Sequence, residues 1–214
     1  MPALKTLGGL GYIFSIIPGL NLVAPFLIGI AWFQMGGRTR QTLFRATGVF
    51  IIITYVAALG FLAVFAATFL PLIFSVASLG EAAPISDVLS MLSTVAVFGL
   101  VGFLVAVFGF VSFILELVSH FRASGVFLSK WFRRAAWMRI LSIIIAVVLV
   151  VAVGVFSVLA PAGMIGLNGD FAVFGSAFLL IFIPVIVIGL LAPIFSAVAF
   201  FTIPEAPPPP PDVY

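Results

Sequence analysis

The chain alternates between long runs of apolar residues and short polar stretches. About 20 consecutive apolar residues, at about 1.5 Å rise per residue, suffice to cross the hydrocarbon of a bilayer as an α-helix. Four runs exceed this length and predict spanning helices over residues 46–70, 88–119, 140–160 and 171–203. A proline follows three of these runs, and we expect it to end each helix because it lacks a backbone donor: Pro71, Pro161 and Pro204.

Two shorter apolar segments, residues 4–17 and 22–34, precede the first long run, and each is short for a span. Pro18 and Gly19 form a turn dipeptide between them, and Asn21 favours a turn or a helix cap. Two interpretations are open: one kinked helix across the membrane, or a hairpin of two short helices. We favour the hairpin, because it accounts for the break and keeps Lys5 on the side of the other basic residues.

These elements predict an all-α fold, a polytopic transmembrane helix bundle with four long spans plus an N-terminal Pro-Gly-broken helical hairpin. We expect residues 1–203 to form a single membrane domain and residues 204–214 a stiff, proline-rich tail. Composition agrees, since 64% of the 214 residues are hydrophobic, 7% are charged and the mean hydropathy is +1.44. Soluble domains carry about 25% charged residues. A soluble fold, and with it a soluble nucleic-acid-binding surface, is therefore excluded.

Eight of the nine basic residues gather in two short stretches, residues 36–45 and 120–139. The other two interhelical loops contain no lysine or arginine. By the positive-inside rule the two basic stretches face the cytoplasm. We therefore expect a multi-pass protein of the cell membrane with a cytoplasmic C-terminus and, if the hairpin forms, a cytoplasmic N-terminus.

The segment 126–139 has the spacing of a basic amphipathic helix. Lys130, Arg133 and Arg134 share one face, and Phe132, Ala135, Ala136 and Met138 fall on the other. Trp137 lies among the basic residues, whereas Arg139 falls on the apolar face. Such a helix lies in the membrane interface. It is either a topological anchor or a specific contact with lipid headgroups or a partner, made by Lys130, Arg133, Arg134 and Trp137.

Few polar residues lie inside the apolar runs. Glu116 is four residues before His120, which predicts an ion pair with His120 or Arg122; a proton or cation pathway is the alternative. Asn21 is a further candidate polar site. The chain has no cysteine and one histidine, so we expect no thiolate chemistry, no multi-histidine metal centre and no catalytic or cofactor site.

Two further patterns bear on architecture. Residues 44–50 (FRATGVF) and 121–127 (FRASGVF) match at six of seven positions, which indicates either a duplicated half or a chance echo in a biased composition. Gly102 and Ala106 have the spacing of small-residue helix contacts, within the bundle or between copies.

Three motifs carry a family resemblance: a glycine-containing basic loop at residues 34–40 (QMGGRTR), the segment 121–127 before a span, and residues 199–204 (AFFTIP) before the proline tail. With the Pro-Gly-broken N-terminal pair, the layout resembles a family of archaeal multi-span membrane proteins classed as a domain of unknown function. The resemblance implies an archaeal cytoplasmic membrane, and it implies no activity and no functional residues.

We therefore expect a non-enzymatic integral membrane protein that is an accessory or structural subunit of a membrane assembly. Its partners would be membrane lipids and other membrane subunits or further copies of itself, without nucleic acid. The alternative is a small-solute or ion transporter or channel with its pathway at the break in residues 18–21. An intramembrane enzyme has little support, because the predicted spans offer Ser and Thr without a histidine or lysine base or an Asp pair.

Overall fold

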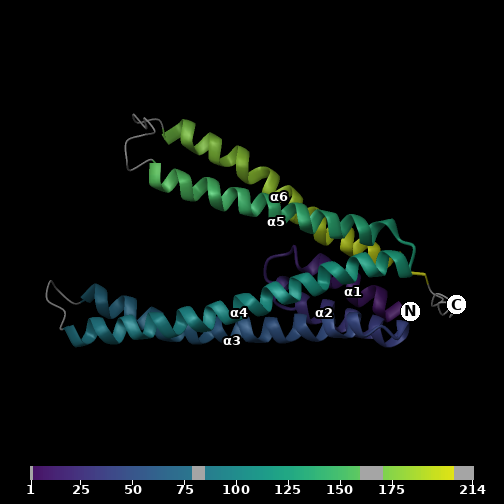
Figure 1. Cartoon of the computed structure of the whole chain (residues 1–214), viewed down its shortest axis with the longest axis horizontal. Helices are drawn as coiled ribbons and strands as arrows, with labels where there is room; N and C mark the ends of the chain where they lie inside the picture. Colours follow the sequence, from purple (N-terminus) through teal and green to yellow (C-terminus); the bar gives the residue numbers. More distant parts are fainter. Residues whose placement is uncertain (1, 79–84, 160–170, 205–214) are drawn as a thin grey trace. The chain divides into compact units, whose positions relative to one another are not determined.

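The computed structural model describes residues 2–78, 85–159 and 171–204, and all regular secondary structure in these residues is helical (Figure 1). The elements are α1 (Pro2–Phe14), η1 (Leu20–Leu22), α2 (Ala24–Thr39), α3 (Thr42–Ser78), α4 (Ile85–Val126), α5 (Lys130–Leu159) and α6 (Phe171–Phe201). This confirms the predicted all-α class. The predictions for Pro161 and for the proline tail lie outside the described residues.

Five stretches of the described chain are long and apolar enough to cross a bilayer. Four of them fall in the predicted long runs, and the fifth is Leu20–Thr39, which joins η1 to α2. The sequence interpretation underestimated this last stretch because it ended the helix at Gln34, whereas α2 continues through the paired glycines to Thr39. The chain is a membrane-spanning helical protein.

The N-terminal segment contains two helices rather than one kinked helix. Gly19 has a φ of 85°, a left-handed conformation that glycine adopts without strain. The backbone N–H of Ile17 donates to Phe14 O at 3.1 Å, and that of Asn21 donates to Ile17 O at 3.0 Å. These bonds satisfy backbone groups around Pro18, so the break costs little within a membrane protein.

Two predicted boundaries were wrong. Helix α3 does not end at Pro71 but continues to Ser78 with Pro71 inside it. A proline removes one backbone donor, and in an apolar stretch the remaining helical bonds outweigh that loss. Segment 126–139 is not a helix of its own: α4 ends at Val126, Leu128 adopts a positive φ of 50°, and α5 begins at Lys130.

The chain divides into two compact units. Unit 1 comprises Met1–Leu27 and Leu117–Tyr214, and unit 2 comprises Ile28–Glu116. Helix α4 therefore contributes its last turns to unit 1 and its longer part to unit 2.

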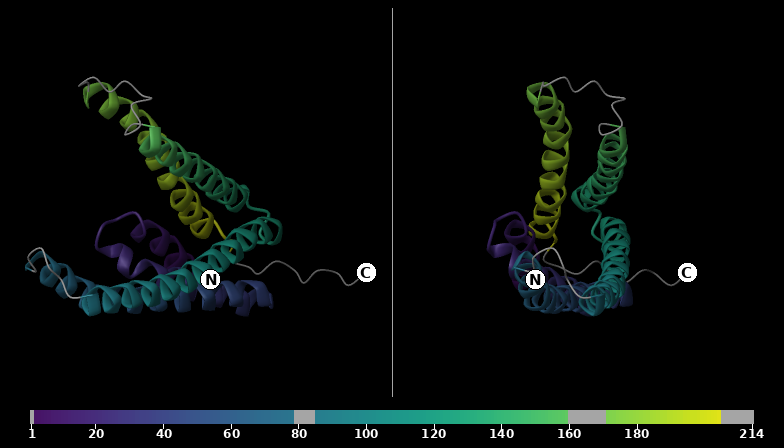
Figure 2. Two further views of the ribbon diagram at one scale, coloured as in Figure 1. Left: turned by 60° about the vertical axis from the view of Figure 1, so that its left-hand side comes forward. Right: turned by 90° about the vertical axis from the view of Figure 1, so that its left-hand side faces the viewer.

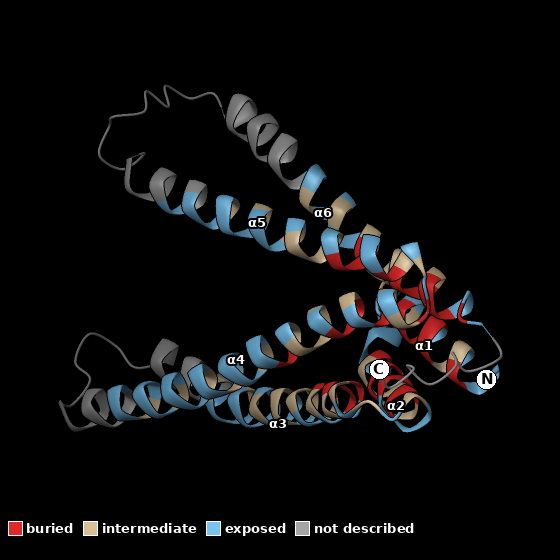
Figure 3. Cartoon of the chain, turned by 45° about the vertical axis from the view of Figure 1, so that its right-hand side comes forward, coloured by how far each residue is buried: buried red, intermediate tan, exposed pale blue. Residues whose placement is uncertain are grey.

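In unit 2, α2 packs closely on the first turns of α3. A Cβ atom on Gly29 would lie 2.6 Å from Ile52 Cγ1, and one on Gly48 would collide with the carbonyl oxygen of Gly29. Trp32 packs against Phe44 with ring centroids 5.4 Å apart, and both side chains are buried. Small residues thus let the two backbones approach, as is common between helices in membranes. Figure 3 shows the buried residues of α3 in this part, and mostly exposed residues farther along.

Farther along unit 2, α3 and α4 lie side by side (Figures 1 and 2). Thr54 Oγ1 donates to Phe108 O at 3.3 Å, and Thr47 Oγ1 lies within hydrogen-bonding distance of both Leu43 O and Leu115 O. Phe98 of α4 then sits among three rings of α3, with centroid separations of 6.1, 5.8 and 5.0 Å to Phe61, Phe65 and Phe69. A Cβ on Gly102 would lie 3.1 Å from the Phe61 ring. This glycine therefore packs against a helix of the same unit, which is one of the two roles that the sequence suggested for Gly102 and Ala106.

We expect Phe98→Ala to destabilise unit 2 by about 1–2 kcal/mol, because aromatic pairs contribute about 0.5–1.5 kcal/mol beyond their buried area. Lipid acyl chains replace much of the lost apolar contact, so the variant does not lose as much stability as it would if an empty cavity formed in a closed core. Phe110→Ala is the matched control, since Phe110 lies on the same helix and is 63% exposed. Chemical unfolding in detergent, followed by circular dichroism, measures both; equal loss in the two variants would contradict the role of the cluster.

In unit 1, α6 packs along α5 and also against α1. A Cβ on Gly8 would collide with the ring of Phe200, and one on Gly9 with the ring of Phe201. The two glycines of α1 therefore make room for two large aromatic residues of α6. This contact brings α1 to the polar residues described next.

Candidate functional site

Polar side chains from three helices of unit 1 meet at one hydroxyl group. His120 on α4 and Ser196 on α6 are fully buried, and His120 Nε2 lies 3.0 Å from Ser196 Oγ. Arg139 on α5 donates from Nη2 to the same oxygen at 3.3 Å. We call these three residues the polar junction; it joins α6 to the consecutive helices α4 and α5.

The hydrogen bonds of Ser196 determine which groups donate and which accept in the polar junction. Ser196 Oγ donates its single proton to Ala192 O at 2.9 Å, one turn earlier on α6. A hydroxyl then has only acceptor positions left, and arginine can only donate. With that arrangement His120 Nε2 carries a hydrogen and donates to Ser196 as well. Ser196 is thus the shared acceptor that links α4 and α5 to α6.

Aromatic side chains enclose the polar junction. Tyr12 of α1 makes an edge contact with His120 at 5.9 Å, and the Arg139 guanidinium lies 5.4 Å from the centre of the same tyrosine ring. Phe132 makes an edge contact with His120 at 5.8 Å and packs against Phe200 at 5.4 Å. Tyr12, Phe132 and Phe200 are all buried. The cation–π contact offsets part of the cost of holding a guanidinium at this place.

The first turns of α5 separate a cationic face from a buried one. Lys130, Arg133 and Arg134 are exposed, whereas Phe132, Ala135 and Ala136 are buried. Arg134 lies 4.9 Å from the centre of the Trp131 ring. Trp137 is 56% exposed and packs edge-on against Phe121 at 5.9 Å. The four residues predicted to contact lipid or a partner therefore share one accessible face.

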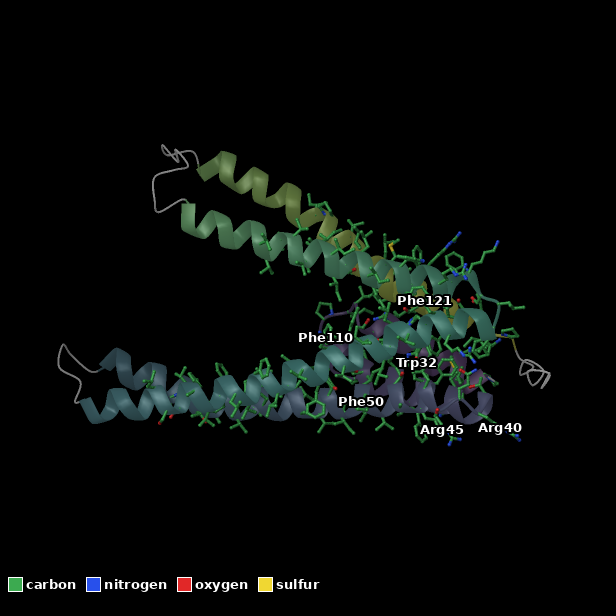
Figure 4. The ribbon with its side chains drawn as sticks, in the orientation of Figure 1. Trp32, Arg40, Arg45, Phe50, Phe110 and Phe121 are labelled. Atoms are coloured by element: carbon green, nitrogen blue, oxygen red, sulfur yellow. The ribbon has the colours of Figure 1, made fainter. Side chains whose placement is uncertain are left out.

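The two basic stretches contain equivalent turns. Arg40 and Leu128, 88 positions apart, are the non-glycine residues with positive φ in the described chain, at 54° and 50°. In each case the next helix begins two residues later. We call residues 31–51 and 119–139 the first and second turn segments. Figure 4 shows Arg40 and Arg45 of the first turn segment pointing away from the ribbon at the start of α3.

The same 88-residue offset relates the packing of both turn segments. Trp32 packs on Phe44 in the first, and His120 packs on Phe132 in the second, all four side chains being buried. Buried Thr47 and Gly48 correspond to buried Ala135 and Ala136. The offset differs from that of the FRATGVF and FRASGVF echo, whose copies lie at the start of α3 and the end of α4. The echo therefore does not coincide with the correspondence between the two turn segments.

The second turn segment has two polar residues at positions where the first turn segment has apolar ones. Its polar junction residues His120 and Arg139 stand where the first turn segment has Trp32 and Ile51. Ser196 of α6 stands 88 positions after Phe108 of α4, which contacts α3 in unit 2. The positions of unit 2 that correspond to His120 and Arg139 therefore carry apolar residues, Trp32 and Ile51.

The other sequence candidates lie elsewhere. Asn21 is exposed within η1, and residues 17–23 are all exposed. Glu116 is partly buried on α4. Its predicted ion pair with His120 or Arg122 stays a prediction. Within the described residues, no group of three or more His, Cys, Asp or Glu side chains is placed to hold a metal ion.

No protein-family model matches the chain, and comparisons with curated proteins and with solved structures find no match either.

Proposed function

We propose that this protein is a non-enzymatic accessory or structural subunit of a membrane assembly. The observation that carries the proposal is the use of the polar side chains inside the helices. Thr47, Thr54 and the polar junction all contact a neighbouring helix. Polar groups used in this way hold helices together.

The exposed surface of unit 2 supports a role in assembly. Helix α4 has 42 residues and α3 has 37, more than the roughly 20 that a single bilayer crossing needs. Large side chains such as Leu100 and Phe103 are more than 60% exposed on α4. Such faces are available to lipid and to helices of other subunits or of a second copy.

We expect extraction into native nanodiscs, without detergent, to give particles whose protein mass exceeds the 22.7 kDa of one chain. A photo-crosslinking amino acid at position 103 should yield an adduct with another membrane protein or a second copy. The same amino acid at position 98, which faces α3, is the control and should yield none. A monomer that forms no adduct at position 103 would contradict the proposal.

The alternative, a transporter with its pathway at residues 18–21, is supported by the exposed Asn21 amide at a helix break. Substrate-dependent flux in proteoliposomes that is lost in Asn21→Leu or Glu116→Gln would favour it over the assembly role.

A further inference from the structure

We propose that the exposed face at the start of α5 binds an anionic phospholipid. The phosphate would lie among Lys130, Arg133 and Arg134, and the acyl chains would lie along the apolar continuation of the same face. This inference does not depend on the proposed assembly role.

Charged, aromatic and aliphatic residues follow one another in order along one face of α5. Steps of three and four residues keep side chains on the same side of an α-helix. From the three basic residues these steps lead to Trp137, and then to exposed apolar residues deeper in the span: Leu141, Ile144, Val148 and Val151. Charge, then indole, then aliphatic side chains follow the order of headgroup, interface and acyl chain in a bilayer leaflet.

Contacts among the described residues do not account for the cations of this face. Within the described residues, Lys130 and Arg133 have no carboxylate partner, and Arg134 stacks on Trp131. Cations in the first turns of a helix also oppose the helix dipole, so they do not stabilise α5 by themselves. An anionic group outside the chain would offset both effects.

The first turn segment has an equivalent helix face that carries fewer cations. The equivalent face of α3 carries Thr42, Arg45, Ala46 and Val49, and it continues into exposed Ile53 and Val56. The exposed residues of this α3 face follow the same spacing as those of the α5 face. The α3 face nevertheless carries one cation, whereas the α5 face carries three. A span of this geometry therefore does not need three cations for its insertion.

Charge complementarity and the apolar continuation together favour a phospholipid over an acidic protein segment. An acidic peptide would match the cations, but it would leave the exposed aliphatic residues beyond Trp137 without a use. A phospholipid matches both parts with one molecule.

The test is quenching of Trp137 fluorescence by lipids with brominated acyl chains, using the full chain in vesicles. The Trp137 signal is the difference between the native protein and Trp137→Phe. We expect brominated phosphatidylglycerol to bind roughly tenfold more strongly than brominated phosphatidylcholine. In K130Q/R133Q/R134Q the preference should fall to about twofold or less.

The matched control is R38Q/R40Q/R45Q, which removes the same charge from exposed positions of the first turn segment. It should retain the roughly tenfold preference, and helix content by circular dichroism should confirm that both triple variants fold. Equal quenching by the two lipids in the native protein would overturn the proposal. So would an equal loss in both triple variants, which would show a general charge effect. Displacement of phosphatidylglycerol by millimolar inorganic phosphate would also overturn it, because the acyl chains would then contribute nothing.

Discussion

Gly48→Ala should destabilise unit 2 by about 2–3 kcal/mol, in the range of overpacking at a site that cannot relax. The added methyl would collide with the carbonyl oxygen of Gly29 and lie 2.6 Å from the backbone nitrogen of Phe33. Both neighbours are main-chain atoms of α2, so no side-chain rotation can relieve the contact. The two helices would have to separate, and the adjoining pair of Trp32 and Phe44 would loosen with them.

Thermal unfolding in detergent, followed by intrinsic fluorescence, measures this effect, because Trp32 reports on the α2–α3 contact. Gly99→Ala is the matched control: Gly99 lies in α4 and a Cβ there meets nothing within 4 Å. Alanine is favoured over glycine in a helix by up to about 1 kcal/mol, so the control should be neutral or slightly stabilising. A similar fall in melting temperature for both variants would show that the α2–α3 contact is not close.

Apolar run length predicted the spanning helices, since lipid leaves a backbone few alternatives to helix. The ends of the helices were harder to predict. Pro71 and the glycines before Thr39 do not end their helices, because the flanking residues are apolar. In lipid, ending the helix would break further backbone hydrogen bonds, which costs more than keeping a proline or glycine inside it. Pro18 is different: with Gly19 beside it the chain can adopt a positive φ, and α1 ends at Phe14, before this turn.

The polar junction was only partly visible in the sequence. His120 was a candidate because it lies four residues after Glu116, and Arg139 stood out as a cation on an apolar face. Ser196 and Tyr12 carried no signal, because a serine or tyrosine in a span is common and its partner depends on how helices distant in sequence pack. The equivalence of the two turn segments was also hidden, since it is a likeness of backbone conformation and burial with few identical residues.

Ser196→Ala should destabilise unit 1 by about 2–4 kcal/mol, more than a single interhelical hydrogen bond in a membrane, which averages about 0.6 kcal/mol. The reason is that one hydroxyl accepts from two donors. Removing it takes an acceptor from part-buried Arg139 Nη2 and from fully buried His120 Nε2 together, and losing the acceptor of a buried donor costs about 1–3 kcal/mol.

The control for this variant is Ser142→Ala, because Ser142 Oγ donates only within its own helix, to Met138 O at 2.8 Å. Its loss should change stability by less than about 0.5 kcal/mol, as expected for a local bond that competes with the helix backbone. A double-mutant cycle of Ser196→Ala with Arg139→Met, measured by unfolding in detergent, separates the shared bond from the rest. If Ser196→Ala is still as costly when Arg139 is absent, the hydroxyl acts through His120 or through packing and not through Arg139. If the two effects are strongly non-additive, Ser196 is the acceptor that allows unit 1 to hold a guanidinium where unit 2 holds an isoleucine.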